Sequence, residues 1–112
     1  MDSGHTQSFS AIPQAGAQPE VILKGDLDMY GATALRDALD GFDQPGVLDM
    51  RAVRYIDSAG LTELVRIAKR VGLGKVTLII ATPMVRKVLR ICGFQHLFRI
   101  VDAVPISANT VP

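Results

Sequence analysis

Short apolar runs rich in β-branched residues alternate with segments whose apolar residues recur every three or four positions. This alternation constrains the fold of the 112-residue chain more than any other feature. Residues 75–81 (KVTLIIA) form the strongest strand pattern, whereas Leu61, Leu64, Val65, Ala68 and Val71 follow helical spacing. Strands that alternate with helices favour a largely parallel sheet with helical crossovers. We therefore expect a single α/β domain.

The apolar periods predict the element order β-β-α-β-α-β-α-β. The expected strands cover residues 9–12, 21–27, 47–50 with further anchors at Val53 and Ile56, 75–81 and 98–101. Helical patterns begin at Ala32, after Asp57-Ser58 and at Thr82-Pro83. With three helices and a first hairpin, we expect a mixed sheet whose helices pack mainly on one face. Residues 1–8 are expected to be flexible, 9–102 to form the domain and 103–112 a loose tail.

Charge and composition exclude several classes of protein. The net charge is +1, from 12 basic and 11 acidic residues, which argues against nucleic acid as a direct partner. The densest basic clusters, residues 66–70 and 86–90, are typical of solvated helix faces. A single cysteine rules out an internal disulfide and suits a reducing compartment. Since the sequence shows neither a signal peptide nor an apolar run of about 20 residues, we expect a cytoplasmic protein with no membrane contact.

Ser58 lies at a strand-to-helix turn, where the nucleophile of a hydrolase would also lie. The G-x-S-x-G elbow of such enzymes requires glycine two residues earlier, and here that residue is Ile56. The candidate bases are His5, in the expected flexible segment, and the isolated His96. A hydrolase is therefore the weaker alternative.

The other enzyme-like patterns are weaker still. Cys92 is expected on the apolar stripe of the third helix, together with Val85, Val88 and Leu89, as a small buried hydrophobe. Gly72-Leu73-Gly74-Lys75 ends a helix, whereas a phosphate-binding loop follows a strand and opens a helix. No cluster of His and Cys suggests zinc. We therefore expect no cofactor, no metal and no enzymatic activity.

The Ser58 hydroxyl at a helix start has two interpretations. It can be a plain N-cap, worth about 1 kcal/mol. It can instead accept a phosphate, which adds about −1.5 to −2 charge. Free backbone N–H groups and the helix dipole would tolerate that anion. These residues alone do not decide between the two interpretations.

Several motifs, in this order, resemble those of STAS domains of bacterial anti-sigma-factor antagonists. They are Gly25-Asp26-Leu27-Asp28, Val47-Leu48-Asp49-Met50, Tyr55-Ile56-Asp57-Ser58-Ala59-Gly60-Leu61, residues 83–89 and Gly93-Phe94. The resemblance covers residues 9–102. Asp26 stands where the family commonly has Glu, and the segment after Val101 lacks the amphipathic pattern of the family's last helix.

The resemblance implies a STAS-type mixed sheet and a partner-switching function. The unphosphorylated protein would bind an anti-sigma factor that is also a Ser/Thr kinase, and phosphorylation of Ser58 would release it. A phosphoserine phosphatase would reverse the modification, so sigma-factor-dependent transcription, as in a stress response, would be regulated. The implied partner-binding residues are Asp28, Asp57, Ser58, Ala59 and Gly60. The alternative within this fold is a non-switching scaffold, either a stressosome component or a transporter-associated subunit.

Overall fold

The computed structural model describes residues 9–103. The elements are β1 (Ser10–Gln14), β2 (Glu20–Leu27), α1 (Met29–Ala38), β3 (Gly46–Ile56), α2 (Ser58–Val71), β4 (Val76–Ile80), α3 (Pro83–Ile91), the 3-10 helix η1 (Phe94–His96) and β5 (Arg99–Asp102). Apart from η1, this is the predicted order. The expected flexible N-terminus, and the expected C-terminal tail beyond Ala103, lie outside the described residues.

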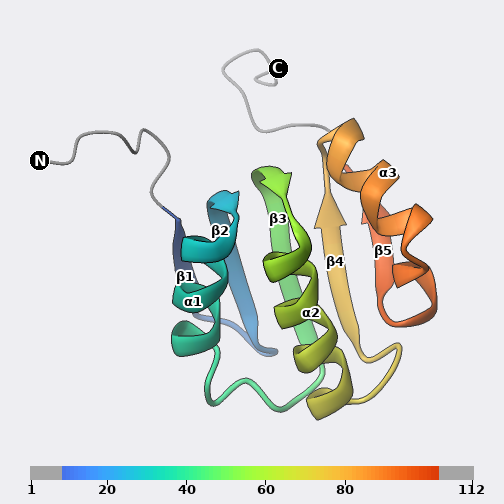
Figure 1. Ribbon diagram of the computed structural model, residues 1–112. Helices are drawn as coiled ribbons and strands as arrows, with labels where there is room; N and C mark the ends of the chain where they lie inside the picture. The colour runs from blue at the N-terminus through green and yellow to red at the C-terminus, as the bar shows by residue number, and fades with distance from the viewer. Residues whose placement is uncertain (1–8, 104–112) are drawn as a thin grey trace, which may run out of the picture.

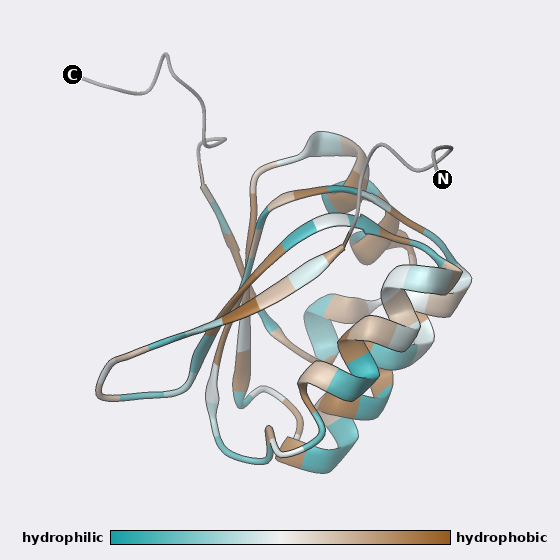
Figure 2. Cartoon of the chain, turned by 90° about the vertical axis from the view of Figure 1, so that its left-hand side faces the viewer, coloured by the Kyte–Doolittle hydropathy of each residue, from teal (hydrophilic) through white to brown (hydrophobic). Residues whose placement is uncertain are grey.

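The five strands form one mixed sheet in the order β1-β2-β3-β4-β5 (Figure 1). β1 pairs with β2 antiparallel, and the other neighbours are parallel. From β2 onward each crossover moves to the next position in the same direction. Since such crossovers are right-handed, all three helices come to lie on one face of the sheet (Figure 2). The predicted mixed sheet with helices on one face is confirmed.

The hydrophobic core fills the space between the sheet and the helical layer. Alternate residues of the strands point into it, including Leu23, Leu48 and Leu78, none of which is exposed. Each helix contributes a fully buried leucine, and these are Leu35, Leu64 and Leu89. The same alternation sends the other residues of each strand to the face without helices.

Several boundaries differ by a few residues from the sequence prediction, and two of these differences have local reasons. α1 begins at Met29 instead of Ala32 because Asp28 caps it. It ends at Ala38, which is exposed, while Leu39 reaches the core from beyond the helix. β3 continues past Met50 to Ile56 because two register irregularities against β2 absorb extra residues without ending the strand.

The predicted environment of Cys92 is wrong. The residue is exposed and forms the C-cap of α3, because the helix ends one residue earlier, at Ile91. Val85 and Leu89 of the predicted stripe are buried and Val88 is partly buried, as expected. Cys92 is therefore not part of the core.

Candidate functional site

The site is built on two strand-to-helix turns that lie side by side. β2 and β3 are parallel neighbours, and their last residues, Leu27 and Ile56, are partners in the sheet. The Asp57 N–H also donates a hydrogen bond of 3.2 Å to the Leu27 carbonyl, which joins the two turns directly. The starts of α1 and α2 are therefore held together at the carboxyl end of the parallel strands.

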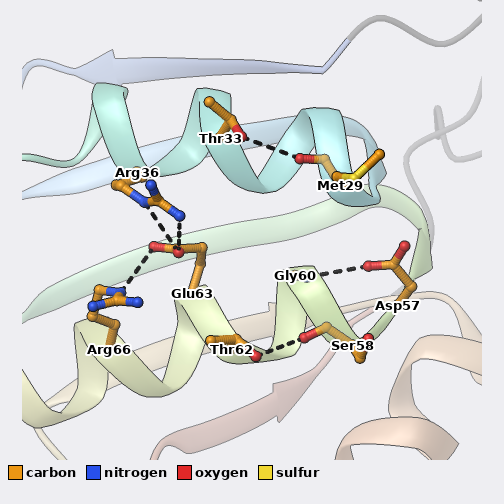
Figure 3. Close-up of polar contacts among 9 residues, drawn as sticks. All are labelled: Met29, Thr33, Arg36, Asp57, Ser58, Gly60, Thr62, Glu63 and Arg66. Atoms are coloured by element: carbon orange, nitrogen blue, oxygen red, sulfur yellow. Dashed lines mark hydrogen bonds and ion pairs between the residues drawn. The ribbon is translucent and has the colours of Figure 1, made fainter.

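Asp57, and not Ser58, caps α2. Its Oδ1 accepts hydrogen bonds from the N–H group of Ala59 at 2.9 Å and from that of Gly60 at 3.2 Å, and Figure 3 shows the second of these. Ser58 is the first residue of the helix and is exposed. Within residues 9–103 its hydroxyl has no hydrogen-bond partner, whereas its carbonyl accepts from Thr62 Oγ1 at 2.8 Å. The plain N-cap interpretation of Ser58 is therefore wrong, and its hydroxyl has no structural task.

Asp28 plays the same part for α1 as Asp57 does for α2. Its Oδ1 accepts from the N–H groups of Tyr30 at 3.0 Å and Gly31 at 2.9 Å. Each carboxylate therefore satisfies two amides that a helix start would otherwise leave without a partner. Both aspartates of the predicted binding set are needed by the fold itself.

Gly60 is buried, and its lack of a side chain is required within the molecule. A Cβ at this position would lie 2.4 Å from the Leu27 carbonyl oxygen. The resemblance implied that Gly60 belongs to the partner-binding residues, and that role stays a prediction. The approach that the structure shows is that of α2 to the end of β2. Ala59 is partly buried beside it.

Glu63 is a buried carboxylate that the sequence analysis did not identify. It is 3% exposed, and it accepts a hydrogen bond of 2.9 Å from Arg36 of α1 and pairs with Arg66 at 3.5 Å (Figure 3). Hydrogen bonding to this carboxylate raises the pKa of the Arg36 guanidinium. The pair ties α1 to α2 one turn below Ser58. Its spacing of three residues from Gly60 was the available signal that Glu63 lies on the buried stripe.

Exposed apolar side chains also gather at this end of the sheet. Met29 and Tyr30 lie in the first turn of α1, Tyr55 is the last residue but one of β3, and Met84 is the second residue of α3. All four begin or end elements at the carboxyl edge of the parallel strands, the edge that carries Ser58. Sequence reasoning did not identify them, although an apolar residue just after a capping aspartate is an available signal.

Within residues 9–103, the histidine that the hydrolase alternative offers as a base, His96, lies far from Ser58 in the fold. His96 precedes Leu97, whose carbonyl accepts from Gly74 N–H, just before β4 begins. That is the edge where the parallel strands start (Figure 1), whereas Ser58 begins α2 just after β3 ends, at the opposite edge. His5 lies outside the described residues. Across residues 9–103 no group of three His, Cys, Asp or Glu residues could hold a metal ion, and no helix is long and apolar enough to cross a membrane.

The fold is that of an α/β protein with a mixed sheet and one helical layer, and comparisons with known proteins give its family. The chain belongs to the STAS-domain family, because the family model described as "Mlab, STAS domain" matches residues 10–102. A STAS-domain containing protein of Pseudomonas aeruginosa (strain UCBPP-PA14) is 30% identical over 99 residues, covering 83% of this chain and 98% of the relative.

Solved structures with this fold include an anti-sigma factor antagonist from Mycobacterium paratuberculosis. It is 23% identical, with a TM-score of 0.75 and coverage of 84% of this chain and 86% of the other. The phosphorylated form of the Bacillus cell fate determinant SpoIIAA is 16% identical, with a TM-score of 0.62 and coverage of 85% and 92%. These similarities establish a shared fold.

Proposed function

We propose that this protein is an anti-sigma factor antagonist that acts by partner switching and not as an enzyme. In the cytoplasm, its unphosphorylated form binds an anti-sigma factor with Ser/Thr kinase activity, and phosphorylation of Ser58 releases that partner. A phosphoserine phosphatase restores binding, so that sigma-factor-dependent transcription, as in a stress response, follows the state of Ser58. The observation that carries the proposal is the exposed Ser58 hydroxyl, which Asp57 relieves of any capping role.

The surroundings of Ser58 make a phosphate there costly when a partner docks. Asp57 already accepts from the amides of Ala59 and Gly60, so these donors are not free, contrary to the sequence expectation. A phosphate of about −1.5 to −2 charge would lie next to the Asp57 carboxylate. A charge buried without a partner costs about 3–5 kcal/mol, and each 1.4 kcal/mol changes affinity about tenfold.

The exposed apolar residues around this edge supply contact area for the unphosphorylated form. Met29, Tyr55 and Met84 present large side chains that a partner can cover. Apolar and aromatic anchors surrounding a small polar centre are typical of binding surfaces. A phosphate on Ser58, in the middle of such a surface, would lose its water when a partner docks. The turn between β3 and α2 supplies no cationic side chain to pair with it.

The decisive experiment compares three forms of the chain with a partner captured from host lysate and identified by mass spectrometry. Calorimetric titration should show that Ser58→Ala binds as the wild type does and cannot be switched off by kinase and ATP. Phosphorylated wild type should bind at least about 100-fold more weakly, a loss of about 2.7 kcal/mol. Thr62→Ala, one turn along the same exposed face, is the matched control and should still be phosphorylated and released.

Circular dichroism melts must show that every form remains folded. Stoichiometric phosphate on the Ser58→Ala variant would refute the assignment of Ser58. Binding of phosphorylated and unphosphorylated protein within about threefold of each other would refute the switch. The chain would then be a constitutive STAS scaffold, such as a stressosome component or a transporter-associated subunit.

A further inference from the structure

The face of the sheet opposite the helices carries a row of residues in register across all five strands. None of residues 9–103 places a helix over this face (Figure 2). The register pairs Ile12 with Ile22, Ile22 with Asp49, Asp49 with Ile79, and Ile79 with Val101. We call these five residues the open-face row. Ile12 and Val101 are exposed, and Ile22 and Ile79 are partly buried.

The centre of the open-face row is a neutral ion pair. Asp49 is only 1% exposed, and it accepts from Arg51 Nη2 at 2.7 Å, from Nε at 3.0 Å and from the Arg51 N–H at 3.1 Å. Burial by itself would raise the pKa of Asp49, but the hydrogen bonds from Arg51 outweigh it and lower that pKa. The carboxylate therefore stays ionised and paired, and the middle of the face carries no net charge.

The row is symmetric about β3, with two aliphatic residues on each side of the ion pair. A two-fold axis that runs along β3 in the plane between two facing sheets would exchange β1 with β5 and β2 with β4. It would set Ile22 against Ile79 of a second copy, and Ile12 against Val101 of that copy. Facing sheets pack about 10 Å apart with their strands aligned to within about 30°. We propose that the open face binds a second copy of this chain in this orientation.

The charged residues one row along the same face of the sheet are also placed favourably by this two-fold axis. This row pairs Gln14 with Glu20, Glu20 with Val47, Val47 with Thr77, and Thr77 with Arg99. Exchange of β1 with β5 sets Arg99 against Gln14 of the second copy, diagonally next to its Glu20. Opposite charges therefore meet at both ends of this row, and two-fold symmetry makes each contact twice. An axis across the strands would instead set β1 against β1.

The size of the face predicts a weak and reversible dimer. Four strand spacings and five residues along each strand give about 19 Å by about 16 Å, or about 300 Å². A standard interface buries about 800 Å² per partner. Because this footprint is less than half of that area, the dimer should form only at about 100 μM and above. Its axis follows the strands, so both Ser58 turns would lie uncovered at one end of the assembly.

Sedimentation equilibrium of the purified chain between about 10 μM and 1 mM tests the proposal without a kinase or partner. We expect the mean mass to rise from 12.0 kDa toward twice that value. Ile12→Lys should raise the dissociation constant at least tenfold, because it sets a cation against Val101 of the second copy. Ile91→Lys is the matched control on α3, where Ile91 is 74% exposed, and it should change nothing.

A second substitution tests the direction of the axis. In Ile12→Lys combined with Val101→Glu, each new cation would face a new carboxylate of the other copy, and dimerisation should recover to within about threefold of the wild type. Circular dichroism melts check that each variant folds. A wild type that stays at 12.0 kDa up to 1 mM would refute the proposal. Equal effects of Ile12→Lys and Ile91→Lys, or no recovery in the double variant, would refute it as well.

Discussion

The turn that leads into α1 and the turn that leads into α2 are local copies of each other. Residues 27–35 (LDMYGATAL) and 56–64 (IDSAGLTEL) share an aspartate, a glycine, a threonine and a leucine at the same spacing. In both, the aspartate caps the helix, and the threonine hydroxyl donates to the carbonyl of the first helical residue. Their first helical residues, which are both exposed, differ: Met29 in the first turn corresponds to Ser58 in the second.

The comparison separates the residues that build such a turn from the residue that is left for function. The shared aspartate and glycine recur where no serine is present, so the turn needs them for its own geometry. Three of the five predicted binding residues, Asp28, Asp57 and Gly60, therefore have structural roles whether or not a partner touches them. Ser58 has none, which makes it the residue whose presence the fold does not explain.

The glycines should give the largest effect on stability. Gly60→Ala and Gly31→Ala would place a Cβ 2.4 Å and 2.3 Å from backbone oxygens, so each should lower the free energy of unfolding by about 3 kcal/mol. Urea denaturation measures the loss. Gly41→Ala, with no atom within 4 Å of the new Cβ, should stay within about 0.5 kcal/mol of the wild type. If only one of the two glycines mattered, the turns would not be copies.

The capping aspartates should give a smaller effect that is equal in the two turns. Asp28→Ala and Asp57→Ala each remove an acceptor for two amides, and each should cost about 1 kcal/mol. Asp28→Asn and Asp57→Asn keep an acceptor oxygen and should recover most of that loss. Thermal melts of the four variants make the comparison. The backbone hydrogen bond from the Asp57 N–H to the Leu27 carbonyl is kept in Asp57→Ala, so a much larger loss for Asp57→Ala than for Asp28→Ala would contradict the equivalence of the two caps.

Replacing Ser58 should give the smallest effect on stability. Because Asp57 supplies the cap, Ser58→Ala should change the free energy of unfolding by less than about 0.5 kcal/mol. Met29→Ala in the other turn is the matched control, since Met29 is also an exposed first residue. The measurement is the same urea denaturation. A loss for Ser58→Ala as large as that for Asp57→Ala would mean that the hydroxyl shares the capping role.

The element order could be predicted from the sequence because each helix or strand has its own local pattern of apolar residues. The apolar, β-branched run of β4 and the helical spacing of Leu61, Leu64 and Ala68 can each be recognised within a dozen residues. The position of Ser58 at a strand-to-helix turn was readable for the same reason. Which side chain caps α2 was not, because Asp57 and Ser58 are both good N-cap residues and the choice depends on how the chain leaves β3.

The tertiary structure alone decided the partners of the buried charges and the environments of the helix ends. Glu63 and Arg36 are 27 residues apart in the chain, and they meet only because α1 and α2 pack as neighbours. Cys92 follows the period of α3 but is exposed, because the helix ends before it. The open-face row unites residues from five strands whose register no local pattern encodes. Spacing along the chain determines each element and the face that it buries, whereas contacts between distant residues arise only when the elements pack.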